Sequence, residues 1–478
     1  MREAIQAYLF GATLLVDAFV ISFNFPEMIQ TLFFSGATSA FLIPVCSRYL
    51  NDPEEFSKLY STFMNLALLV TGLVSLGFLA LSGDIMRLIA PGFTPETKRV
   101  AYYLFIIMIP VITLHALLSV MKAFLNAREH FAAPELSGVL WNLAFIAAAL
   151  LLSKHIGIYS LALGVSVGAL IQVFYQVPYL RRHGIHYRPS LSLRHPAVDE
   201  ARRLFTGALI ATSIVPINSF VGRIIGSYLP AGEVAGLAYA FRIFILPFSL
   251  FAVPAYTVLF SRLSTLHHEG DWEGTRAHVD SVLVLLFVTL VPSTIFLCMM
   301  GDTCIQILYQ RGAFTPHDTA VTYRALLGYS TGLLFYALSI CFVRVFNAMH
   351  DMRTPAIVGI TSIALNALVA WLLMPVLGNM GISLATSLVS CYNFLALYLI
   401  FRRRTGYIPS HHTKREIIKA VTAGIILTGL LVILKFAFFG HPYVLFAAGT
   451  LTTLVIYGFF FKEYYFSLLR RPGSGSSA

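Results

Sequence analysis

Apolar segments of about 20 residues recur from one end of this 478-residue chain to the other. Each is long enough to cross the roughly 30 Å hydrocarbon core of a bilayer as a helix. Lipid offers the backbone no hydrogen-bond partner, so such segments must be helical. Only 12% of the residues are charged, against roughly 25% in a soluble domain. The chain is therefore predicted to be an all-α polytopic membrane protein.

The apolar segments set the predicted order of membrane helices. A short apolar segment, Ala4 to Phe10, precedes the first of them. The predicted membrane segments are 13–47, 59–82, 100–121, 136–153, 158–180, 204–228, 234–261, 279–300, 320–343, 355–376, 380–401, 416–436 and 442–461.

Lys and Arg are divided unevenly between the loops on the two sides. One alternating set of loops holds 22 of them, most densely at 181–203 and 402–415. The other set holds six: Arg87, Lys98, Arg99, Lys154, Arg311 and Lys435. Cytoplasmic loops carry the excess of Lys and Arg, so the first set and the C-terminus are predicted to be cytoplasmic. The net charge of +11 is then expected to face anionic membrane lipids rather than nucleic acid.

The sequence repeats itself at a single offset of 221 residues. The repeated elements are 92–95 (GFTP) with 313–316 (AFTP), 124–127 (FLNA) with 345–348 (VFNA), Pro26 with Pro247, and Pro134 with Pro355. Six predicted helices separate equivalent positions, and this even number makes the two copies parallel. The repeat therefore predicts two six-helix lobes related by an axis along the membrane normal, as in transporters built from two halves.

The repeat also predicts the domain organisation. We assign residues 1–198 to an N-lobe, 199–410 to a C-lobe and 411–471 to an additional helix pair outside the repeat. The tail 472–478 (PGSGSSA) is interpreted as a linker or fusion scar. The segment 204–228 has only a short counterpart ending near Tyr8, so the first helix of the N-lobe is predicted to be truncated.

Signatures of catalysis or cofactor binding are not found in the sequence. It contains no GxxxxGK[ST] motif, and its five cysteines form no CxxC pair. His267-His268 and His411-His412 fall in predicted loops and lack metal-ligand spacing. We therefore predict no cofactor, no metal site and no enzymatic activity.

Ionisable residues inside apolar segments are the candidate functional residues, because a charge in lipid is costly and usually functional. Arg223 lies in the segment 204–228, Arg2 precedes it by the repeat offset, and Arg242 is nine residues into the next segment. Clustered guanidinium groups suit a diphosphate, since their planar fork binds phosphate oxygens bidentately. Asp17 is predicted to pair with one of these arginines, so that the resting cavity holds no unpaired charge.

Several short motifs, in order, resemble the MurJ (MviN) lipid II flippases, a family of the MATE-like multidrug/oligosaccharidyl-lipid/polysaccharide exporter superfamily. The motifs are 2–3 (RE), 17–19 (DAF), 25–26 (FP), 36–37 (GA), 39–41 (SAF), Pro44, 90–93 (APGF), 125–127 (LNA) and 312–315 (GAFT). The resemblance implies 14 helices, two lobes around a cationic cavity and a C-terminal pair that forms a groove for a polyprenyl tail. It further implies outward transfer of undecaprenyl-diphosphate-linked peptidoglycan precursor across the bacterial inner membrane.

The resemblance carries over to four candidate residues. Arg2 matches the family's arginine at the end of the first helix, and Glu3 matches its acidic neighbour. Asp17 matches the aspartate of the second helix, and Arg242 the arginine of the eighth. At two secondary positions the chain departs from the family, which has an arginine and a glutamate where this sequence has Gln30 and Ser35.

These departures leave alternatives open. A paralogue could move another polyprenyl-diphosphate-linked glycan. For the flippase itself, the membrane potential or a monovalent cation is the expected driving force. A MATE-type exporter of cationic drugs would need buried carboxylates, which the apolar segments of the second copy lack. A membrane enzyme would need clustered Asp, Glu or His at a membrane face, and the sequence shows no such cluster. The remaining alternative is a scaffold that has kept the fold but lost transport activity. The resemblance favours alternating-access transport by a monomer.

Overall fold

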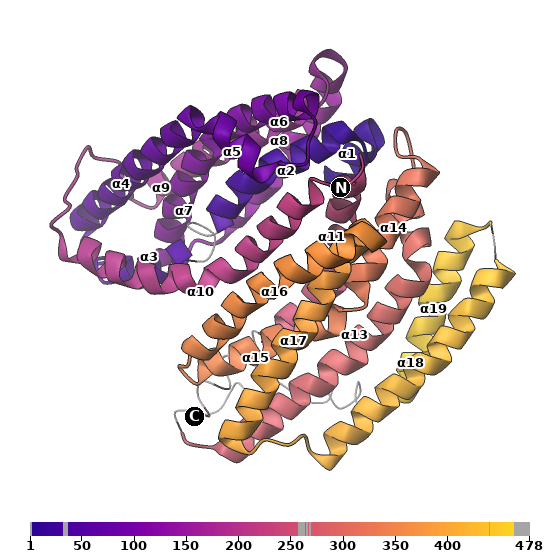
Figure 1. Ribbon diagram of the computed structural model, residues 1–478. Helices are drawn as coiled ribbons and strands as arrows, with labels where there is room; N and C mark the ends of the chain where they lie inside the picture. The colour runs from indigo at the N-terminus through magenta and orange to yellow at the C-terminus, as the bar shows by residue number, and fades with distance from the viewer. Residues whose placement is uncertain are drawn as a thin grey trace. The chain divides into compact units, whose positions relative to one another are not determined.

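The apolar segments form helices in the computed structural model (Figure 1). It describes residues 2–31, 37–256, 263, 266, 269–438 and 440–462, but not the side chains of 37–41, 206–216, 218 and 219. Over these described ranges the structure contains helices and no strand. The predicted all-α class is confirmed.

Each predicted membrane segment contains helix. The α-helices are α1 (Arg2–Phe10), α2 (Leu14–Gln30), α3 (Ala37–Ser47), α4 (Pro53–Ala80), α5 (Ser82–Ile89), α6 (Pro95–Met108), α7 (Pro110–Ala127), α8 (Ala132–Ile156), α9 (Tyr159–Arg182), α10 (Pro196–Gly226), α11 (Glu233–Pro247), α13 (Trp272–Tyr309), α14 (Pro316–Ser330), α15 (Leu333–Ala348), α16 (Arg353–Leu377), α17 (Asn379–Thr405), α18 (His411–Ala437) and α19 (Pro442–Phe460). A π-helical turn, η2 (Phe248–Ala252), follows α11.

Length and composition make many of these helices membrane-spanning. Among the described residues, ten helices are long and apolar enough to cross a bilayer, or eleven when α14 and α15, bent by 45°, count as one span. The largest departure from the sequence prediction is α13, whose 38 residues extend well beyond the predicted segment 279–300. At 1.5 Å per residue it is about 57 Å long, because its polar ends continue the helix outside the apolar core.

The helices form two compact units. The first comprises Met1–Ala235 with Arg311–Thr315, and the second comprises Gly236–Gln310 with Pro316–Ala478. In the first unit, the buried ring of Phe124 on α7 packs 4.9 Å from the ring centroid of Phe56 and 5.3 Å from that of Tyr60, both on α4. The lobe boundaries at 198 and 410 remain predictions, because compact packing and sequence repetition divide the chain by different criteria.

The additional C-terminal pair packs within the second unit. Helices α18 and α19 lie along α13 (Figure 1), where Leu427 and Leu431 join a buried apolar cluster with Val288. At one end of the pair, Lys435 Nζ lies 2.6 Å from Asp302 Oδ2. This ion pair fixes α18 to α13 beyond the apolar contact.

The repeat is visible in the helix bounds. Helix α8 matches α16 residue for residue at the offset of 221, and the segment from the start of α6 to the end of α7 matches the segment from the start of α14 to the end of α15. Both α8 and α16 end at a glycine of positive φ, Gly157 at 56° and Gly378 at 60°. A residue with a Cβ rarely adopts this conformation, so the same chain reversal is built twice with the same residue type.

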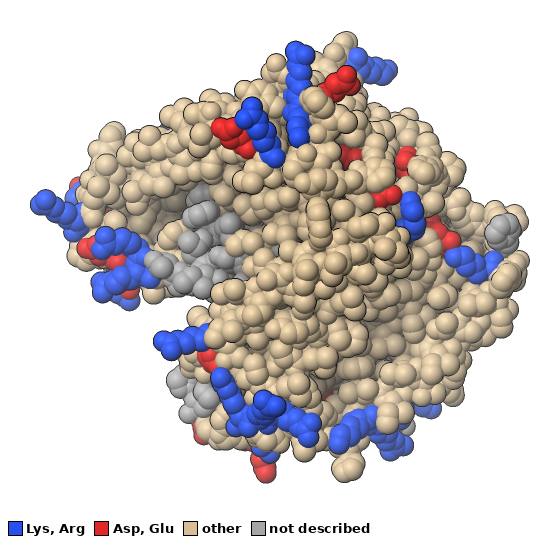
Figure 2. Space-filling view, viewed as in Figure 1, with Lys and Arg blue, Asp and Glu red and all other residues tan. Residues whose placement is uncertain are grey.

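Charged side chains lie mainly in the loops and in the end turns of the helices. Figure 2 shows Lys and Arg side chains at the margins of a broad surface with few charges. In the first unit, Arg48 pairs with Glu200 at 2.9 Å, and Arg188 pairs with Glu54 at 3.0 Å. Both pairs join a loop to a helix end, on the side that the distribution of Lys and Arg predicts to be cytoplasmic.

Asp351 caps α16, and the cap should be insensitive to pH near neutrality. Its Oδ1 accepts the backbone N–H of Arg353 and of Thr354, each at 3.0 Å. Burial alone would raise the pKa of Asp351, but hydrogen bonds from Thr354 and the Arg404 guanidinium lower it to about 2. Since the folded pKa lies below the ordinary value, the stabilisation is complete above about pH 4 and is lost as the pH falls through 2.

Replacement of Asp351 by Ala is expected to destabilise the protein by about 0.5–2 kcal/mol at pH 7, the usual cost of a lost N-cap. Thermal unfolding of the purified chain at several pH values measures this. The difference from wild type should be constant from pH 8 to 5 and should narrow below pH 4. Asp84→Ala, which removes an exposed partner of Arg87, is the control and should change stability by less than about 0.5 kcal/mol. A difference that already narrows between pH 7 and 5 would contradict the assignment.

Candidate functional site

The Asp17 carboxylate caps a helix that is distant in sequence. Its Oδ2 accepts the backbone N–H of Gly232 at 2.6 Å, and its Oδ1 accepts that of Ala235 at 2.7 Å. The side chain is on α2 and is buried, whereas both donors lie at the N-terminal end of α11, where backbone N–H groups lack helical partners. A carboxylate there also compensates the positive end of the helix dipole.

The predicted ion pair of Asp17 is not formed with Arg2 or Arg223 among the described residues of the first unit, and its pairing with Arg242, which belongs to the second unit, stays a prediction. Both carboxylate oxygens accept backbone N–H groups, and among the described residues of the first unit no cation lies within ion-pairing distance. A close backbone approach makes this arrangement possible: a Cβ on Gly232, at φ 86°, would lie 2.2 Å from the carbonyl oxygen of Ala12. Glycine is therefore required where the loop before α11 meets the loop before α2.

Aromatic rings enclose Arg2. Its Cζ lies 4.8 Å from the ring centroid of Trp141 and 5.0 Å from that of Phe145, both on α8, and 5.9 Å from that of Phe23 on α2. Glu3 lies 3.3 Å from its Nη2. The indole N–H of Trp141 donates to a backbone carbonyl of α9 at 3.1 Å, which fixes the ring. Cation–π contacts and one carboxylate thus hold the guanidinium.

Arg223 has polar partners instead. Its Nη1 lies 3.6 Å from Glu27 Oε2 and donates to Asn24 Oδ1, and both partners are on α2. About a quarter of the Arg223 side chain is exposed, 23%, against 12% for Arg2. The two arginines are repeat mates in sequence, but their surroundings differ: aromatic rings of α8 and α2 enclose Arg2, whereas Arg223 contacts a carboxylate and an amide of α2.

Arg242 lies on an exposed face of α11. Its neighbours Ile243 and Phe244 are buried, while Arg242 shares its helix face with Leu246 and Leu250, which are also exposed. Nine residues from the start of α11, it is about 13 Å along the helix axis. Arg242 belongs to the second unit, whereas Arg2 and Arg223 belong to the first. The predicted cluster of three guanidinium groups therefore remains a prediction.

The two secondary positions differ in how far they can be described. Gln30 is half-buried at the C-terminal end of α2, one turn beyond Glu27. Ser35 lies outside the described residues.

The sequence did not predict the partner roles of Asn24, Glu27 and Trp141. The presence of Glu27 in an apolar segment was a weak sequence indication that it has a cationic partner. Nothing in the local sequence of Trp141 indicates its contact with Arg2, which is 139 positions away.

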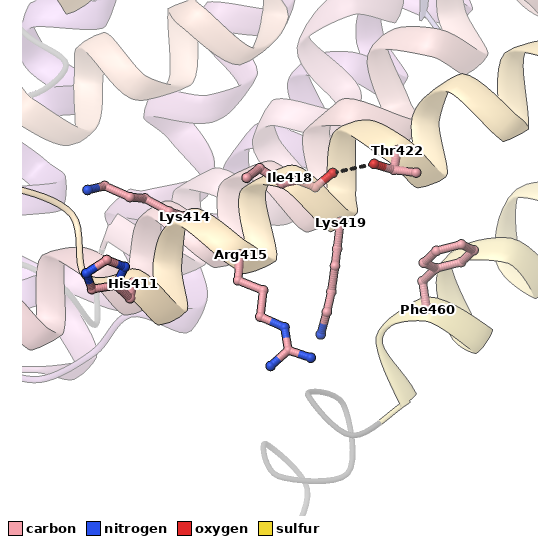
Figure 3. A pocket seen from close by; sticks show the side chains of 7 residues that line it. All are labelled: His411, Lys414, Arg415, Ile418, Lys419, Thr422 and Phe460. Carbon is pink, nitrogen blue, oxygen red and sulfur yellow. Dashed lines mark hydrogen bonds between the residues drawn. The ribbon is translucent and has the colours of Figure 1, made fainter.

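A basic pocket of about 460 Å³ lies between the first turns of α18 and the end of α19 (Figure 3). The Arg415 and Lys419 side chains point in the same direction, beside Phe460 of α19 (Figure 3). The remaining lining residues are His411, Lys414, Ile418 and Thr422. Lys419 also pairs with Glu416 at 2.6 Å. Among the described residues no group of three or more His, Cys, Asp or Glu could hold a metal ion.

Solved structures of low sequence identity define the class of fold. The chain is similar to a multidrug resistance MATE family transporter of the MOP superfamily in an inward-facing conformation, with a TM-score of 0.72 and 14% identity over 84% of this chain and 93% of that chain. The chain is therefore a polytopic membrane protein with the MATE-type transporter fold.

The family is narrower than this class. A family model described as "Lipid II flippase MurJ" matches residues 6–452, and the chain belongs to that family. It is 29% identical to "Lipid II flippase MurJ" of Burkholderia cenocepacia over 90% of this chain and 85% of the relative, and 28% identical to "Probable lipid II flippase MurJ" of Vibrio cholerae over the same shares. A solved structure, "Lipid II flippase MurJ, inward closed conformation", has a TM-score of 0.85 and 25% identity, covering 98% of this chain and 96% of that chain.

Proposed function

We propose that the protein is a flippase that moves lipid II, or a related polyprenyl-diphosphate glycolipid, from the inner to the outer leaflet of a bacterial cytoplasmic membrane. The family match across residues 6–452 is the observation that carries this proposal. The sugar-peptide headgroup is the part of such a lipid that resists crossing, because its polar groups would lose water without new hydrogen bonds. A protein that supplies polar partners on the way removes much of that barrier.

In the proposed mechanism the arginines at membrane depth bind the diphosphate during alternating access. Arg242 is exposed and can offer its guanidinium fork to phosphate oxygens. Arg223 is in contact with Glu27, so a diphosphate would have to replace that carboxylate. Arg2 would offer a guanidinium fixed in place by the surrounding rings and by Glu3. Because Asp17 is occupied by backbone N–H groups, we propose that it positions α11, the helix that carries Arg242.

The remaining features of the proposal concern the membrane. We propose that the protein acts as a monomer with a cytoplasmic C-terminus, and that the basic pocket on α18 contacts anionic lipids. Charge moved across the bilayer couples transport to the membrane potential, at about 2.3 kcal/mol per elementary charge per 100 mV. The sequence and the family favour transport rather than an enzymatic reaction.

A specific observation supports a second candidate substrate. Gln30 and Ser35 stand where the family resemblance implies an arginine and a glutamate. Losing a cation and an acid together preserves the charge balance but changes the polar partners offered to a headgroup. A paralogue for another polyprenyl-diphosphate-linked glycan would retain the same fold and the diphosphate-binding arginines.

Expression of the chain in bacterial cells depleted of their own lipid II flippase tests the proposal. Growth should be restored, and newly made lipid II should become accessible to an externally added lipid II-cleaving enzyme. Membrane expression of the chain is checked by immunoblotting. Normal membrane levels without rescue and without accessible lipid II would reject lipid II as the substrate and favour the second candidate.

A further inference from the structure

An extended segment between α9 and α10, residues 184–195, runs along the first turns of α4 (Figure 1). Its backbone has no regular secondary structure over 185–192. Side chains of α4 supply the hydrogen-bond partners that a neighbouring strand would supply in a sheet. The hydrogen bonds join His186 N–H to Ser57 Oγ at 3.3 Å, Arg188 N–H to Ser61 Oγ at 2.7 Å, Ser192 N–H to Thr62 Oγ1 at 3.4 Å, and Asn65 Nδ2 to the carbonyl oxygen of Ser190 at 2.8 Å. The segment is therefore fixed to α4 although it is not helical.

The segment follows α4 and then returns. It meets α4 first at Ser57 and reaches Asn65 with Ser190. From there it turns back, and His195 Nε2 lies 3.0 Å from Glu55 Oε1. From Ser57 to Asn65 is eight residues of α4, about 12 Å along the helix axis. Ser190 thus marks the turning point of the segment, where it is farthest from the start of α4.

The turning point lies close to the part of α4 that faces lipid. Residues 59–63 of α4 are buried, whereas Leu68, Leu69 and Val70 are exposed by 49%, 51% and 51%. Because α4 is long and apolar enough to span a bilayer, this exposed apolar face is expected to contact hydrocarbon. Asn65 precedes Leu68 by three residues, about 4.5 Å along the axis. The segment therefore reaches to within one helical turn of the lipid-facing surface.

Apolar side chains on both sides of the turning point are exposed. The exposed fractions are 55% for Tyr187, 45% for Leu191 and 52% for Leu193. The Tyr187 hydroxyl donates to Asn65 Oδ1 at 2.7 Å, so the polar group of this ring is satisfied while its apolar body is exposed. The backbone hydrogen bonds to α4 lower the cost of placing non-helical backbone at the edge of the hydrocarbon. Both features suit a segment that lies in the interfacial layer of a membrane.

The charge of this surface is positive. Residues 181–198 contain no Asp or Glu, and Glu54 and Glu55 are in the first turn of α4, away from the turning point. The segment and the end of α9 carry four exposed arginines: Arg181, Arg182, Arg188 and Arg194. Only Arg188 forms an ion pair with a described residue, Glu54 at 3.0 Å. Exposed Tyr and Leu side chains among arginines, continuous with a lipid-facing helix, match the headgroup layer of an anionic leaflet.

We propose that residues 184–195 form an interfacial membrane anchor. Tyr187, Leu191 and Leu193 enter the headgroup layer of the adjacent leaflet, and the neighbouring arginines contact the phosphates of anionic lipids. The anchor holds the connection between α9 and α10 at the bilayer surface, on the side that the distribution of Lys and Arg predicts to be cytoplasmic. This inference does not depend on the proposed function.

The depth of a nitroxide label on the full chain tests the proposal. Leu191→Cys is labelled in nanodiscs of phosphatidylcholine with phosphatidylglycerol, and the wild type, labelled in parallel, gives the background of the five native cysteines. Electron paramagnetic resonance measures collisions of the label with oxygen, which concentrates in lipid, and with a water-soluble nickel complex. The ratio of oxygen to nickel collisions at Leu191 should be several-fold higher than at the controls. Leu193→Cys should give the same result and covers the case in which Leu191→Cys does not fold.

Two matched controls are exposed polar residues at the same end of α4. His186→Cys is on the segment itself but lies at Ser57, and Asn51→Cys is in the turn before α4. Both should report water. The ratio at Leu191 should fall when phosphatidylglycerol is omitted, because the arginines then lose their anionic partners.

Three results would overturn the proposal. Ratios at Leu191 and Leu193 equal to that at Asn51 would place the segment in water. An unchanged ratio in phosphatidylcholine alone would remove the role of anionic lipid. Labels that are open to nickel in nanodiscs but shielded in native membranes would show that a protein, rather than lipid, covers this surface.

Discussion

Replacement of Arg242 with Ala is expected to abolish rescue of flippase-depleted cells and to lower the rate of lipid II transfer at least roughly 100-fold. The guanidinium can make two charge-assisted hydrogen bonds to a diphosphate, and each contributes about 1.5–3 kcal/mol. Arg242→Lys is expected to rescue only in part, since a point charge cannot reproduce the bidentate fork. Complementation and accessibility of lipid II to an added cleaving enzyme measure both effects at matched membrane levels.

A matched control separates this effect from a general loss of positive charge. Arg403→Ala removes an exposed arginine from the last turn of α17, outside the proposed site, and should leave transfer unchanged. Full activity of Arg242→Ala would remove the diphosphate-binding role of this residue. The family membership and the fold would not be affected by that result.

Replacement of Asp17 with Ala is expected to destabilise the protein by about 2–4 kcal/mol, because the buried backbone N–H groups of Gly232 and Ala235, at the start of α11, would lose their acceptors. Asp17→Asn keeps one acceptor oxygen and should cost less. Thermal unfolding of the purified chain and its level in membranes are the measurements. If Asp17 instead acted mainly on the substrate, both variants would unfold like wild type and lose transport.

Glu27→Gln is the control for the loss of a carboxylate from α2. Glu27 is one-third exposed and lies 3.6 Å from Arg223, so its removal should cost less stability than Asp17→Ala. An equal loss in the two variants would mean that negative charge on α2, rather than capping of α11, stabilises the fold.

The fold could be predicted from the sequence to a large extent because the bilayer simplifies the problem. An apolar segment long enough to cross the bilayer must be helical. A single repeat offset then predicts which helices of the two copies correspond to one another. The offset of 221 found in short motifs is the offset that relates α8 to α16. The helix ends were less predictable: α13 continues far past its apolar segment because polar residues at its ends are helical as well.

The candidate site was less predictable than the fold. Their positions in the apolar part of the sequence indicated that Asp17 and Arg2 are charged residues that need partners. In the structure both have partners. The sequence did not predict that Asp17 accepts two backbone N–H groups at the start of α11, or that aromatic rings enclose Arg2. Backbone N–H groups and ring faces occur in every segment, so no local sequence pattern marks the ones that will be used.

The sequence by itself determined the class of protein, the number of its repeats and the positions at which a charge must be compensated. These properties depend on composition and spacing along one chain, and the cost of a charge or an unpaired backbone group in lipid applies to any arrangement of helices. Only the tertiary structure decided which group compensates each charge. That choice depends on which helices pack together, and a contact such as that between Asp17 and Gly232 joins residues more than 200 positions apart.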